Sequence, residues 1–540
     1  MKTHQQLPEE RYFKYKSVGA VFHSKLHSTP HSTFIISIYK NKTETCTYNQ
    51  FAAKVVCTQK YFQDKGLKKG DVINIIIENS EAFLILYISA LSMGVVVCPV
   101  NYNMMPPEIL YIINDSKARM VFVDEEYAGK VISIKEHLPA VGEIVIFSYN
   151  SQNEWQFFNI NSIFQNADSY ATEHSLKIDA CIEDPGVIIY TSGTSGNPKG
   201  VILTQANMLA DAQAIAEWFS FDSDTRTLCI LPLFHNNGQI VTFLAPLWAG
   251  GSTVMIKGNV SLYSFWDIVS RYKVTWTSVI PTILSVLLSL RKKPEANSLH
   301  GIICGGALLP ERVQLEFEEN FGVPVYEGYG LTETTSFSCF NPKNISLRKI
   351  GSVGVSLPVN EMCIMDEEET RMEAEITGEI CIRGYNVFSA YLNLPEKSIS
   401  SVRNGWFHSG DFGHRDKDGF YYIEGRKDDL IIKGGENIYP GEIENVVYNH
   451  PKIKDCAALG VPHPLWGEDI IMFVELKNGE KSSQEEIRKF CEDKIAVYKI
   501  PGKIFFIGES KGLNEIPKGP TKKILRSKLL EYYNNKLNMK

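Results

Sequence analysis

The 540-residue sequence predicts an α/β protein whose large N-terminal domain packs helices in layers on a mixed, mostly parallel sheet. Helical and strand-like segments alternate through most of the chain, which is typical of βαβ units. The pattern changes at 351–423, where short strands and frequent turns indicate a small β-rich subdomain. A compact α+β pattern follows. Because the chain is too long for one core, we predict domains at 1–427 and 428–540.

The alternating elements of the N-terminal domain follow from hydrophobic periodicity. Apolar residues at helical spacing predict helices at 49–65, 83–93 and 204–218. Short apolar runs predict strands at 71–77, 118–123, 186–189, 227–233, 278–280 and 302–304. We therefore expect most of these strands to pair in parallel, with the helices covering the sheet.

The C-terminal domain has its own strand and helix candidates. Strands are predicted at 455–459 and 470–476, and a helix at 483–496. No Pro/Gly/Ser-rich linker precedes this domain, so we expect a short hinge, which we place at Asp428.

Composition argues against several classes of partner and site. The net charge is −7 and no basic block dominates, so a nucleic-acid surface is not expected. The 11 cysteines include no Cys-x-x-Cys pair, which indicates buried free thiols in a reducing cytoplasm and gives no support for a zinc site.

One uncharged run, 83–100, approaches the length of a membrane span. Gly94 and Pro99 interrupt it, so we predict a buried helix followed by a buried strand. The N-terminal residues lack the apolar core of a signal peptide. We expect a cytoplasmic monomer or homodimer without a transmembrane segment, and at most weak membrane contact.

The most informative segment is the loop 190–200, which follows the apolar strand 186–189. Its glycines let backbone N–H groups approach an anion, its hydroxyls donate hydrogen bonds, and Lys199 adds positive charge. A polyphosphate is the ligand that such a loop suits. It is not a Walker A loop, because Pro198 and Gly200 stand where that motif needs Gly and Ser or Thr.

Two further segments carry groups that suit a nucleotide. In 326–333, an aromatic ring lies between two glycines and is followed by a hydroxyl and a carboxylate. In 405–411, Asp411 follows a turn glycine, and a carboxylate there suits the paired hydroxyls of a ribose. Together with the loop 190–200 and in this order, these segments resemble the signatures of the acyl-adenylate-forming superfamily of AMP-binding enzymes, most of all the acyl-CoA synthetases (fatty-acid–CoA ligases). The resemblance spans nearly the whole chain and is weakest before Asn49.

The resemblance implies a role for each motif residue. Tyr329 would stack on the adenine base, Thr332 would donate to a phosphate, and Glu333 would hold Mg²⁺. Asp411 would bind the ribose, and Arg426 the ribose and phosphate. His408 is expected to pack or to bind backbone rather than to act as a base. The full set implied to bind ATP or AMP is Thr191, Ser192, Gly193, Thr194, Ser195, Gly196, Lys199, Gly306, Ala307, Glu327, Gly328, Tyr329, Thr332, Asp411, Ile423, Arg426 and Lys523.

The C-terminal domain of this superfamily is a mobile lid that carries two functional loops. Alignment on Ile524-Leu525-Arg526 places the adenylation lysine at Lys523, which would bridge the acyl carboxylate and the α-phosphate. Lys522 stands where the family usually has Gly. The second loop, Lys433, Gly434, Gly435 and Glu436, would bind coenzyme A, with Gly435 beside the pantetheine arm.

The acyl pocket implied by the resemblance consists of His235, Asn236, Gly305, Gly306 and Ala307, with His235 beside the substrate carboxylate. Small residues at 305–307 would leave room for a chain or a ring. No Asp lies between Leu231 and Gly250, which argues against an amino-acid substrate. Asn236, Asn237 and Gln239 favour a polar acyl group, or else they face backbone or solvent.

The implied activity is an AMP-forming acid–thiol ligase, in which Lys523, Glu333, Thr332 and His235 are the catalytic residues. ATP, Mg²⁺ and coenzyme A would convert a carboxylic acid, such as a fatty acid of lipid metabolism, into acyl-AMP and then acyl-CoA. Two alternatives stay open. The acceptor could be an acyl carrier protein, or the chain could be a nucleotide-binding homologue with impaired catalysis, of which Lys522 would be a trace.

Overall fold

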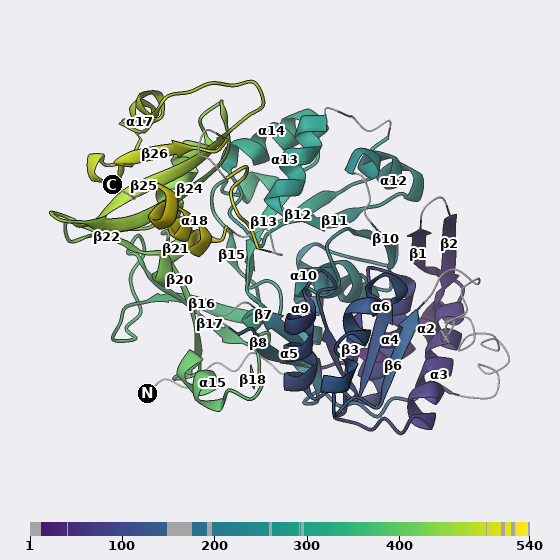
Figure 1. The fold of residues 1–540 in the computed structure, drawn as a ribbon. Coiled ribbons are helices and arrows are strands. Elements are labelled where there is room, and N and C mark those ends of the chain that lie inside the picture. Colours follow the sequence, from purple (N-terminus) through teal and green to yellow (C-terminus); the bar gives the residue numbers. More distant parts are fainter. Residues whose placement is uncertain are drawn as a thin grey trace.

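The computed structural model describes residues 12–39, 42–147, 175–191, 197–258, 262–290, 292, 296–492, 494–508, 513–519 and 524–537. Two large sheets with covering helices form the N-terminal part, a five-stranded sheet forms the β-rich subdomain, and a second five-stranded sheet forms the C-terminal part. The C-terminal elements, yellow-green in Figure 1, form a lobe next to the teal elements in the middle of the chain, and the purple and blue N-terminal elements lie on the far side. The predicted α/β class is confirmed.

The first large sheet has the strand order β18-β8-β7-β4-β3-β5-β6. The pairs β7–β4, β4–β3, β3–β5 and β5–β6 are parallel, whereas β8 is antiparallel to both of its neighbours, β7 and β18. The strands are β3 (Val72–Ile76), β4 (Val96–Pro99), β5 (Met120–Asp124), β6 (Glu143–Phe147), β7 (Pro185–Thr191), β8 (Lys199–Thr204) and β18 (Ala390–Tyr391). The helices of this part are α3 (Tyr48–Asp64), α4 (Glu81–Met93), α5 (Pro106–Ser116), α6 (Glu125–Ile132) and α9 (Gln205–Trp218).

Helix α4 shows why the uncharged run 83–100 folds inside the protein. The Ser80 hydroxyl caps its start by accepting the Phe83 N–H, and Gly94 ends it in the left-handed conformation (φ 73°). Every residue of α4 after Glu81 is buried, and so is strand β4. The predicted buried helix and strand are confirmed. Among the described residues, none of the helices has both the length and the apolar character needed to cross a membrane.

The second large sheet has the order β15-β14-β13-β12-β11-β9-β10-β1-β2. Its strands are β1 (Thr33–Tyr39), β2 (Lys42–Thr47), β9 (Arg226–Cys229), β10 (Ser252–Lys257), β11 (Trp276–Val279), β12 (Gly301–Cys304), β13 (Val325–Tyr329), β14 (Cys339–Phe340) and β15 (Val355–Ser356). Helices α2 (Val18–Ser28), α12 (Phe265–Tyr272), α13 (Pro281–Leu290) and α14 (Glu311–Phe321) belong to this part of the chain.

The strand predicted at 227–233 is shorter in the structure, because β9 ends at Cys229. The Leu231 carbonyl accepts the Asn79 side-chain amide at 2.9 Å, and the next residue, Pro232, has no N–H for a sheet. The chain therefore leaves the sheet here and turns into the short helix α10 (Asn236–Gln239).

The β-rich subdomain contains β16 (Asn360–Met365), β17 (Gly378–Gly384), β19 (Val402–Arg403), β20 (Trp406–Arg415) and β21 (Tyr421–Arg426), with helix α15 (Pro395–Ser401). A short 3₁₀ helix, η6 (Lys427–Asp429), leads out of β21. Asp428 lies inside η6. Our domain boundary and hinge at Asp428 stay a prediction.

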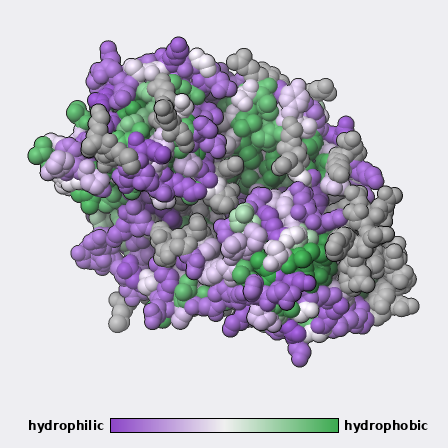
Figure 2. Space-filling model, in the orientation of Figure 1, coloured by the Kyte–Doolittle hydropathy of each residue, from purple (hydrophilic) through white to green (hydrophobic). Residues whose placement is uncertain are grey.

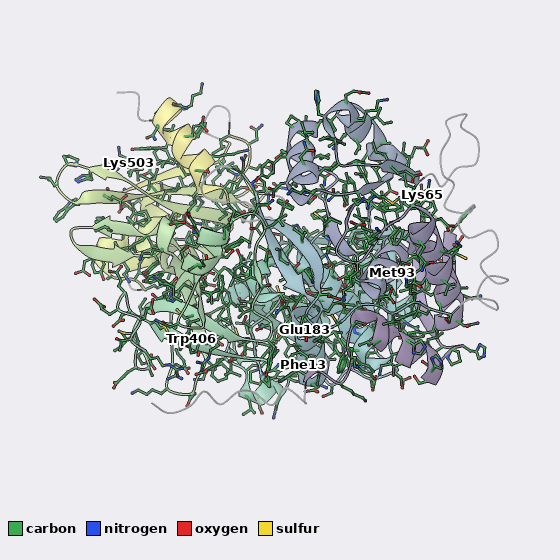
Figure 3. All side chains as sticks on the ribbon, turned by 90° about the horizontal axis from the view of Figure 1, so that it is seen from below. Phe13, Lys65, Met93, Glu183, Trp406 and Lys503 are labelled. Atoms are coloured by element: carbon green, nitrogen blue, oxygen red, sulfur yellow. The ribbon has the colours of Figure 1, made fainter. Side chains whose placement is uncertain are left out.

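The C-terminal lobe contains β22 (Ile431–Lys433), β23 (Glu436–Ile438), β24 (Ile453–His463), β25 (Gly467–Leu476) and β26 (Lys503–Phe506), with α16 (Pro440–Tyr448), α17 (Gln484–Glu492) and α18 (Arg526–Tyr532). The helix predicted at 483–496 was too long, because α17 ends at Glu492 and a separate 3₁₀ turn follows at Val497–Lys499. Figure 3 shows Lys503 of this lobe and Lys65, just after α3, toward opposite ends of the molecule.

Hydrophilic side chains cover most of the face in Figure 2, and hydrophobic residues appear as separate patches between them. Ten of the 11 cysteines are buried, all 11 are unpaired, and Cys181 is partly exposed. This agrees with the expectation of free buried thiols.

Candidate active site

Three of the predicted nucleotide-binding residues meet where the second large sheet touches the β-rich subdomain. Tyr329 ends β13, Asp411 lies within β20, and Arg426 ends β21 directly opposite Asp411. The Tyr329 hydroxyl donates to Asp411 Oδ2 at 2.7 Å, and Arg426 Nε donates to Asp411 Oδ1 at 2.8 Å. Both carboxylate oxygens of Asp411 are thus bound, and the three side chains form a hydrogen-bonded polar cluster.

The electrostatics of this cluster follow from burial. Burial, and then the neighbouring Asp411 charge, raise the pKa of the Tyr329 phenol well above its usual value, so Tyr329 stays a donor. Burial opposes the charge of Arg426, but the Asp411 carboxylate outweighs it and raises the pKa of the guanidinium. The site therefore holds one fixed anion beside one fixed cation, a combination that suits the hydroxyls and phosphate of a nucleotide.

A second cluster joins Glu333 to the end of the phosphate loop. Glu333 lies in the 3₁₀ helix η4 (Thr332–Thr334) and is buried, with the Tyr391 hydroxyl donating to Oε1 at 2.8 Å. Lys199 Nζ lies 3.9 Å from the same oxygen and 4.4 Å from the centroid of the Tyr391 ring. Burial lowers the pKa of Lys199, and Glu333 only partly opposes this.

The residues present fit the Mg²⁺ that the resemblance implies. Carboxylate oxygens are the protein ligands that this ion prefers, and the contacts of Glu333 with Tyr391 and Lys199 both use Oε1 rather than Oε2. Glu333 would hold the ion, which, when bound, would neutralise charge on the ATP phosphates. Thr332 lies next to it in η4.

The chain makes a strained turn directly after Glu333, which sequence reasoning missed. Thr335 has φ 66° and ψ −67°, rare for a β-branched residue, and Ser336 N donates to the Thr334 carbonyl at 2.8 Å. The Asn236 amide donates to the carbonyl of Thr335, and the Thr335 hydroxyl donates to the Asn386 carbonyl at 2.7 Å. The turn is therefore held from both sides, and no residue pattern signals it.

The acyl-wall segment is more enclosed than expected. Burial lowers the pKa of His235 to about 4, so the imidazole is neutral at pH 7. Its ring packs on Phe234, and Nε2 has no hydrogen bond to any described residue. Of the two alternatives for the polar residues, the structure favours backbone contacts for Asn236 and for Gln239, whose Nε2 donates to the Leu233 carbonyl at 2.7 Å.

The expectation that Gly305 leaves room for substrate was wrong. A Cβ atom on Gly305 would lie 2.5 Å from Cε1 of Phe337, so the Phe337 ring already fills that space. Gly305 is buried, whereas Gly306 and Ala307 are exposed. Gly306 has φ 83°, and a Cβ there would come no nearer than 3.7 Å to Ile280. Only the 306–307 part of this wall is open.

Other predicted nucleotide-binding residues lie deeper. Glu327 is 3% exposed, its Oε1 accepts the Leu309 N–H at 3.2 Å, and burial raises its pKa to about 8. Gly328 packs under Phe340, and Ile423 packs in the same apolar cluster as Tyr329. The Glu327 side chain is therefore a neutral internal acceptor at pH 7, and a direct nucleotide contact would have to use its backbone.

The phosphate loop is described only at its ends. Thr191 ends β7 directly opposite Lys199, which begins β8. Ser192, Gly193, Thr194, Ser195 and Gly196 lie outside the described residues, and so does Lys523. Their roles stay predictions.

The predicted coenzyme A loop forms the turn of a β-hairpin. Lys433 of β22 pairs with Glu436 of β23, and Gly434 (φ 63°) and Gly435 (φ 88°) form the tip. The Trp466 ring lies against Gly434, while a Cβ on Gly435 would meet no atom within 4 Å. Lys433 Nζ is bound to Asp469 Oδ1 at 2.7 Å, so its charge is already compensated.

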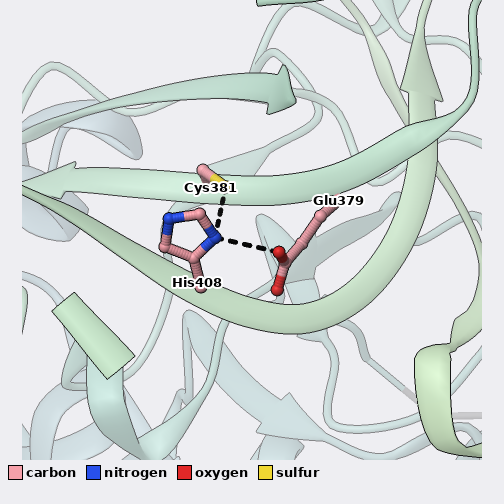
Figure 4. Close-up of side chains that lie close together, drawn as sticks. All are labelled: Glu379, Cys381 and His408. Atoms are coloured by element: carbon pink, nitrogen blue, oxygen red, sulfur yellow. Dashed lines mark hydrogen bonds and ion pairs between the residues drawn. The ribbon is translucent and has the colours of Figure 1, made fainter. Parts of the chain in front are cut away.

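We expected His408 to pack or to bind backbone. Instead, its ring contacts three polar side chains. Its Nδ1 lies 2.9 Å from Glu379 Oε2, 3.4 Å from Cys381 Sγ and 2.7 Å from Arg403 Nη2. Figure 4 shows the first two contacts. Glu379, Cys381 and His408 could each offer a ligand atom to a metal ion. The position of such an ion beside the imidazole is already taken by the positive Arg403 guanidinium. Sequence reasoning could not find this cluster, because the pairing of β17, β19 and β20 brings its members together.

Comparison with known proteins shows the family of the chain. The family model described as "AMP-binding enzyme" matches residues 22–392, and that described as "AMP-binding enzyme C-terminal domain" matches residues 442–520. The chain is 32% identical over 490 residues to sulfoacetate–CoA ligase of Cupriavidus necator, covering 90% of this chain and 92% of the relative. It is 30% identical over 485 residues to oxalate–CoA ligase of Arabidopsis thaliana, covering 87% and 90%.

The fold matches solved structures over nearly the full length. The crystal structure of ATP-bound MatB from Rhodopseudomonas palustris superposes with a TM-score of 0.85 at 26% identity, covering 96% of this chain and 99% of the other. Both sequence and fold therefore match a known class of enzyme. The chain belongs to the AMP-binding enzyme family and, within it, to the AMP-forming acid–CoA ligases.

Proposed function

We propose that this protein converts a carboxylic acid into its coenzyme A thioester in two half-reactions at the site described above. In the first, an oxygen of the acid carboxylate attacks the α-phosphorus of ATP, and the bond from that phosphorus to pyrophosphate breaks. The product is acyl-AMP. In the second, the thiol of coenzyme A loses its proton and attacks the acyl carbonyl, and AMP leaves.

The observation that supports this proposal best is the cluster of Tyr329, Asp411 and Arg426. These residues come from two sheets, and each was predicted from a separate sequence motif to bind the same nucleotide. Asp411 would accept the ribose hydroxyls, and Arg426 would reach from the ribose toward the α-phosphate. Lys199 would carry positive charge to the phosphates that leave.

The acyl pocket carries the remaining roles. The buried His235 would lie beside the substrate carboxylate. Because its imidazole is neutral, it would not form an ion pair that makes this carboxylate a weaker nucleophile. The adenylation lysine, Lys523, would bridge the carboxylate and the α-phosphate. Gly435 would give the pantetheine arm a passage in the second half-reaction, after the C-terminal lobe turns about Asp428.

The test is ATP–pyrophosphate exchange across a panel of acids, followed by thioester formation with coenzyme A. The panel should include sulfoacetate, oxalate and 2-succinylbenzoate, for which relatives are named, as well as fatty acids of several lengths. We expect exchange with at least one acid, and thioester formation with coenzyme A alone. No exchange with any acid would overturn the proposal, and transfer only to a carrier protein would correct its second half.

A further inference from the structure

We propose that Glu379 is a positioning residue, which holds the backbone that presents Asp411 to the ribose of ATP. The inference rests on the proposed role of Asp411 and adds a residue that no nucleotide contact requires. It comes from an irregularity in the sheet of the β-rich subdomain.

The register between strands β17 and β20 shifts where Asp411 lies. Glu379 pairs with Phe412 and Cys381 pairs with His408, so Ser409, Gly410 and Asp411 stand opposite the single residue Ile380. Such a bulge bends a strand and re-aims its side chains, and bulges are frequent beside active sites. Here it brings the Asp411 carboxylate to Tyr329 and Arg426.

The bulge is held by hydrogen bonds from β17. Glu379 Oε1 accepts the Gly410 N–H at 2.9 Å, and Gly410 has φ 72°. The Ser409 hydroxyl donates to the Ile380 carbonyl at 2.7 Å and accepts the Asp411 N–H at 3.0 Å. Glu379 is thus the one charged acceptor among these bonds, and bonds to charged acceptors are the stronger kind.

The second oxygen of Glu379 is fixed by the cluster in Figure 4. Glu379 Oε2 lies 2.9 Å from His408 Nδ1, and the His408 side chain is 6% exposed. Arg403 Nη2 lies 4.0 Å from Glu379 Oε2 and 2.7 Å from His408 Nδ1. One ring nitrogen cannot both donate to Glu379 and accept from Arg403, so His408 binds the carboxylate when Nδ1 carries the proton, and the Arg403 charge attracts the carboxylate in either tautomer. Oε2 of Glu379 thus faces this pair, and Oε1 faces Gly410.

The same contacts argue against a metal site here. Glu379, Cys381 and His408 would offer suitable ligand atoms, but a metal ion would have to displace the Arg403 guanidinium. Burial also raises the pKa of the Cys381 thiol, which disfavours the thiolate that binds metals.

The test compares ATP with 2′,3′-dideoxy-ATP, which lacks the hydroxyls that Asp411 would bind. In Glu379→Ala we expect KM for ATP to rise about tenfold, because a bond to a charged acceptor is lost. KM for the acid should stay unchanged. With dideoxy-ATP, Glu379→Ala and the wild type should have the same KM. An equal loss with both nucleotides, or a rise in KM for the acid, would overturn the proposal.

Two further variants keep the result interpretable if Glu379→Ala folds poorly. Glu379→Gln keeps an oxygen for the Gly410 N–H and should restore most of the ATP affinity. Glu361→Ala removes a carboxylate from the neighbouring strand β16. This carboxylate forms ion pairs with Arg371 and Arg383 and not with residues of the bulge. This variant should leave KM for ATP unchanged.

Calorimetric binding of the two nucleotides separates this proposal from the proposed function. If the wild type binds ATP more tightly than dideoxy-ATP but supports no pyrophosphate exchange, the function fails while Glu379 can still be tested by affinity. If exchange is normal and Glu379→Gln behaves like Glu379→Ala with both nucleotides, only the role of Glu379 fails.

Discussion

At the scale of single residues, burial decides the chemistry of this site more than residue type does. Glu327 and Glu333 lie six positions apart in one motif, and both are buried carboxylates. Glu327 faces a backbone N–H, whereas Glu333 faces a hydroxyl and lies 3.9 Å from a lysine ammonium. The first is therefore an internal acceptor, and the second suits a ligand for a cation.

The raised pKa of Glu327 makes stability depend on pH. Between its ordinary value of 4.5 and about 8, the unfolded chain releases this proton while the folded chain keeps it. Stability should therefore fall as pH rises through this window. In Glu327→Gln this part of the slope should disappear, with a gain on the order of a few kcal/mol above pH 8.

Chemical unfolding at pH 5 and pH 8.5 would check this prediction. Glu136→Gln, at a side chain that is 83% exposed, is the control and should keep the wild-type slope. If Glu327→Gln also keeps that slope, the buried carboxyl is not the cause.

Gly305 gives a second prediction at this scale. Gly305→Ala would place a methyl group 2.5 Å from the Phe337 ring and 2.9 Å from the Gly328 carbonyl. We expect a loss of about 1–3 kcal/mol in the free energy of unfolding, as for other overpacked sites. Gly129→Ala, in helix α6 with open space around it, should be neutral or slightly stabilising. Equal stability of the two variants would contradict the packing role of Gly305.

At the scale of elements, the ends and irregularities of strands place the functional groups. Tyr329 and Arg426 end strands, Asp411 lies in a bulge, and Gly434 and Gly435 form a hairpin tip. Inside a regular strand, the backbone groups bond to the neighbouring strands and many side chains pack in a hydrophobic core. Chain positions that leave the ladder can present side chains or backbone to a ligand.

The β22–β23 hairpin gives a prediction at this scale. Gly435→Leu should leave acyl-AMP formation largely intact and strongly slow thioester formation, because the side chain would fill the space proposed for the pantetheine arm. The two half-reactions can be measured separately by pyrophosphate exchange and by thiolysis of supplied acyl-AMP.

The matched control is Gly479→Leu. Gly479 has φ 82° and open surroundings like Gly435, but it lies in another turn of the C-terminal lobe. It should carry the same backbone strain without the kinetic effect. Similar loss of thiolysis in both variants would mean that strain, and not obstruction, is responsible.

At the scale of the whole molecule, two arginines show how the C-terminal lobe is held together and how it contacts the rest of the protein. Arg526 donates to Asp429 at 3.2 Å and to Glu444 at 2.5 Å, and so links the start of α18 to η6 and α16. Arg312 of α14 donates to the Tyr448 carbonyl at 3.4 Å, which joins the two lobes. Through Asp429, Arg526 couples the start of α18 to η6, which contains the proposed hinge residue Asp428.

Lys523→Ala tests this alternation. If the lysine serves only the first half-reaction, the variant should lose acyl-AMP formation about 100-fold or more and keep thiolysis of supplied acyl-AMP. Arg526 stays intact in this variant, so the lobe keeps its internal ion pairs. Equal loss of both half-reactions would reject the assigned role.

The sequence by itself determined the α/β class, the order of the motifs and the family they resemble. Hydrophobic periodicity, turn residues and glycine-rich loops are local properties, so they can be recognised in the sequence without knowledge of the fold. Most of the predicted strands and helices are present within a few residues of their expected bounds.

Only the tertiary structure decided which side chains meet. The strained turn at Thr335, the Phe337 ring beside Gly305, and the Glu379 bond that holds the Asp411 bulge all join segments far apart in the chain. Packing and register between strands set these contacts, and no local pattern encodes them. For the same reason the burial that lowers the pKa of His235 is a property of the folded protein and not of the local sequence.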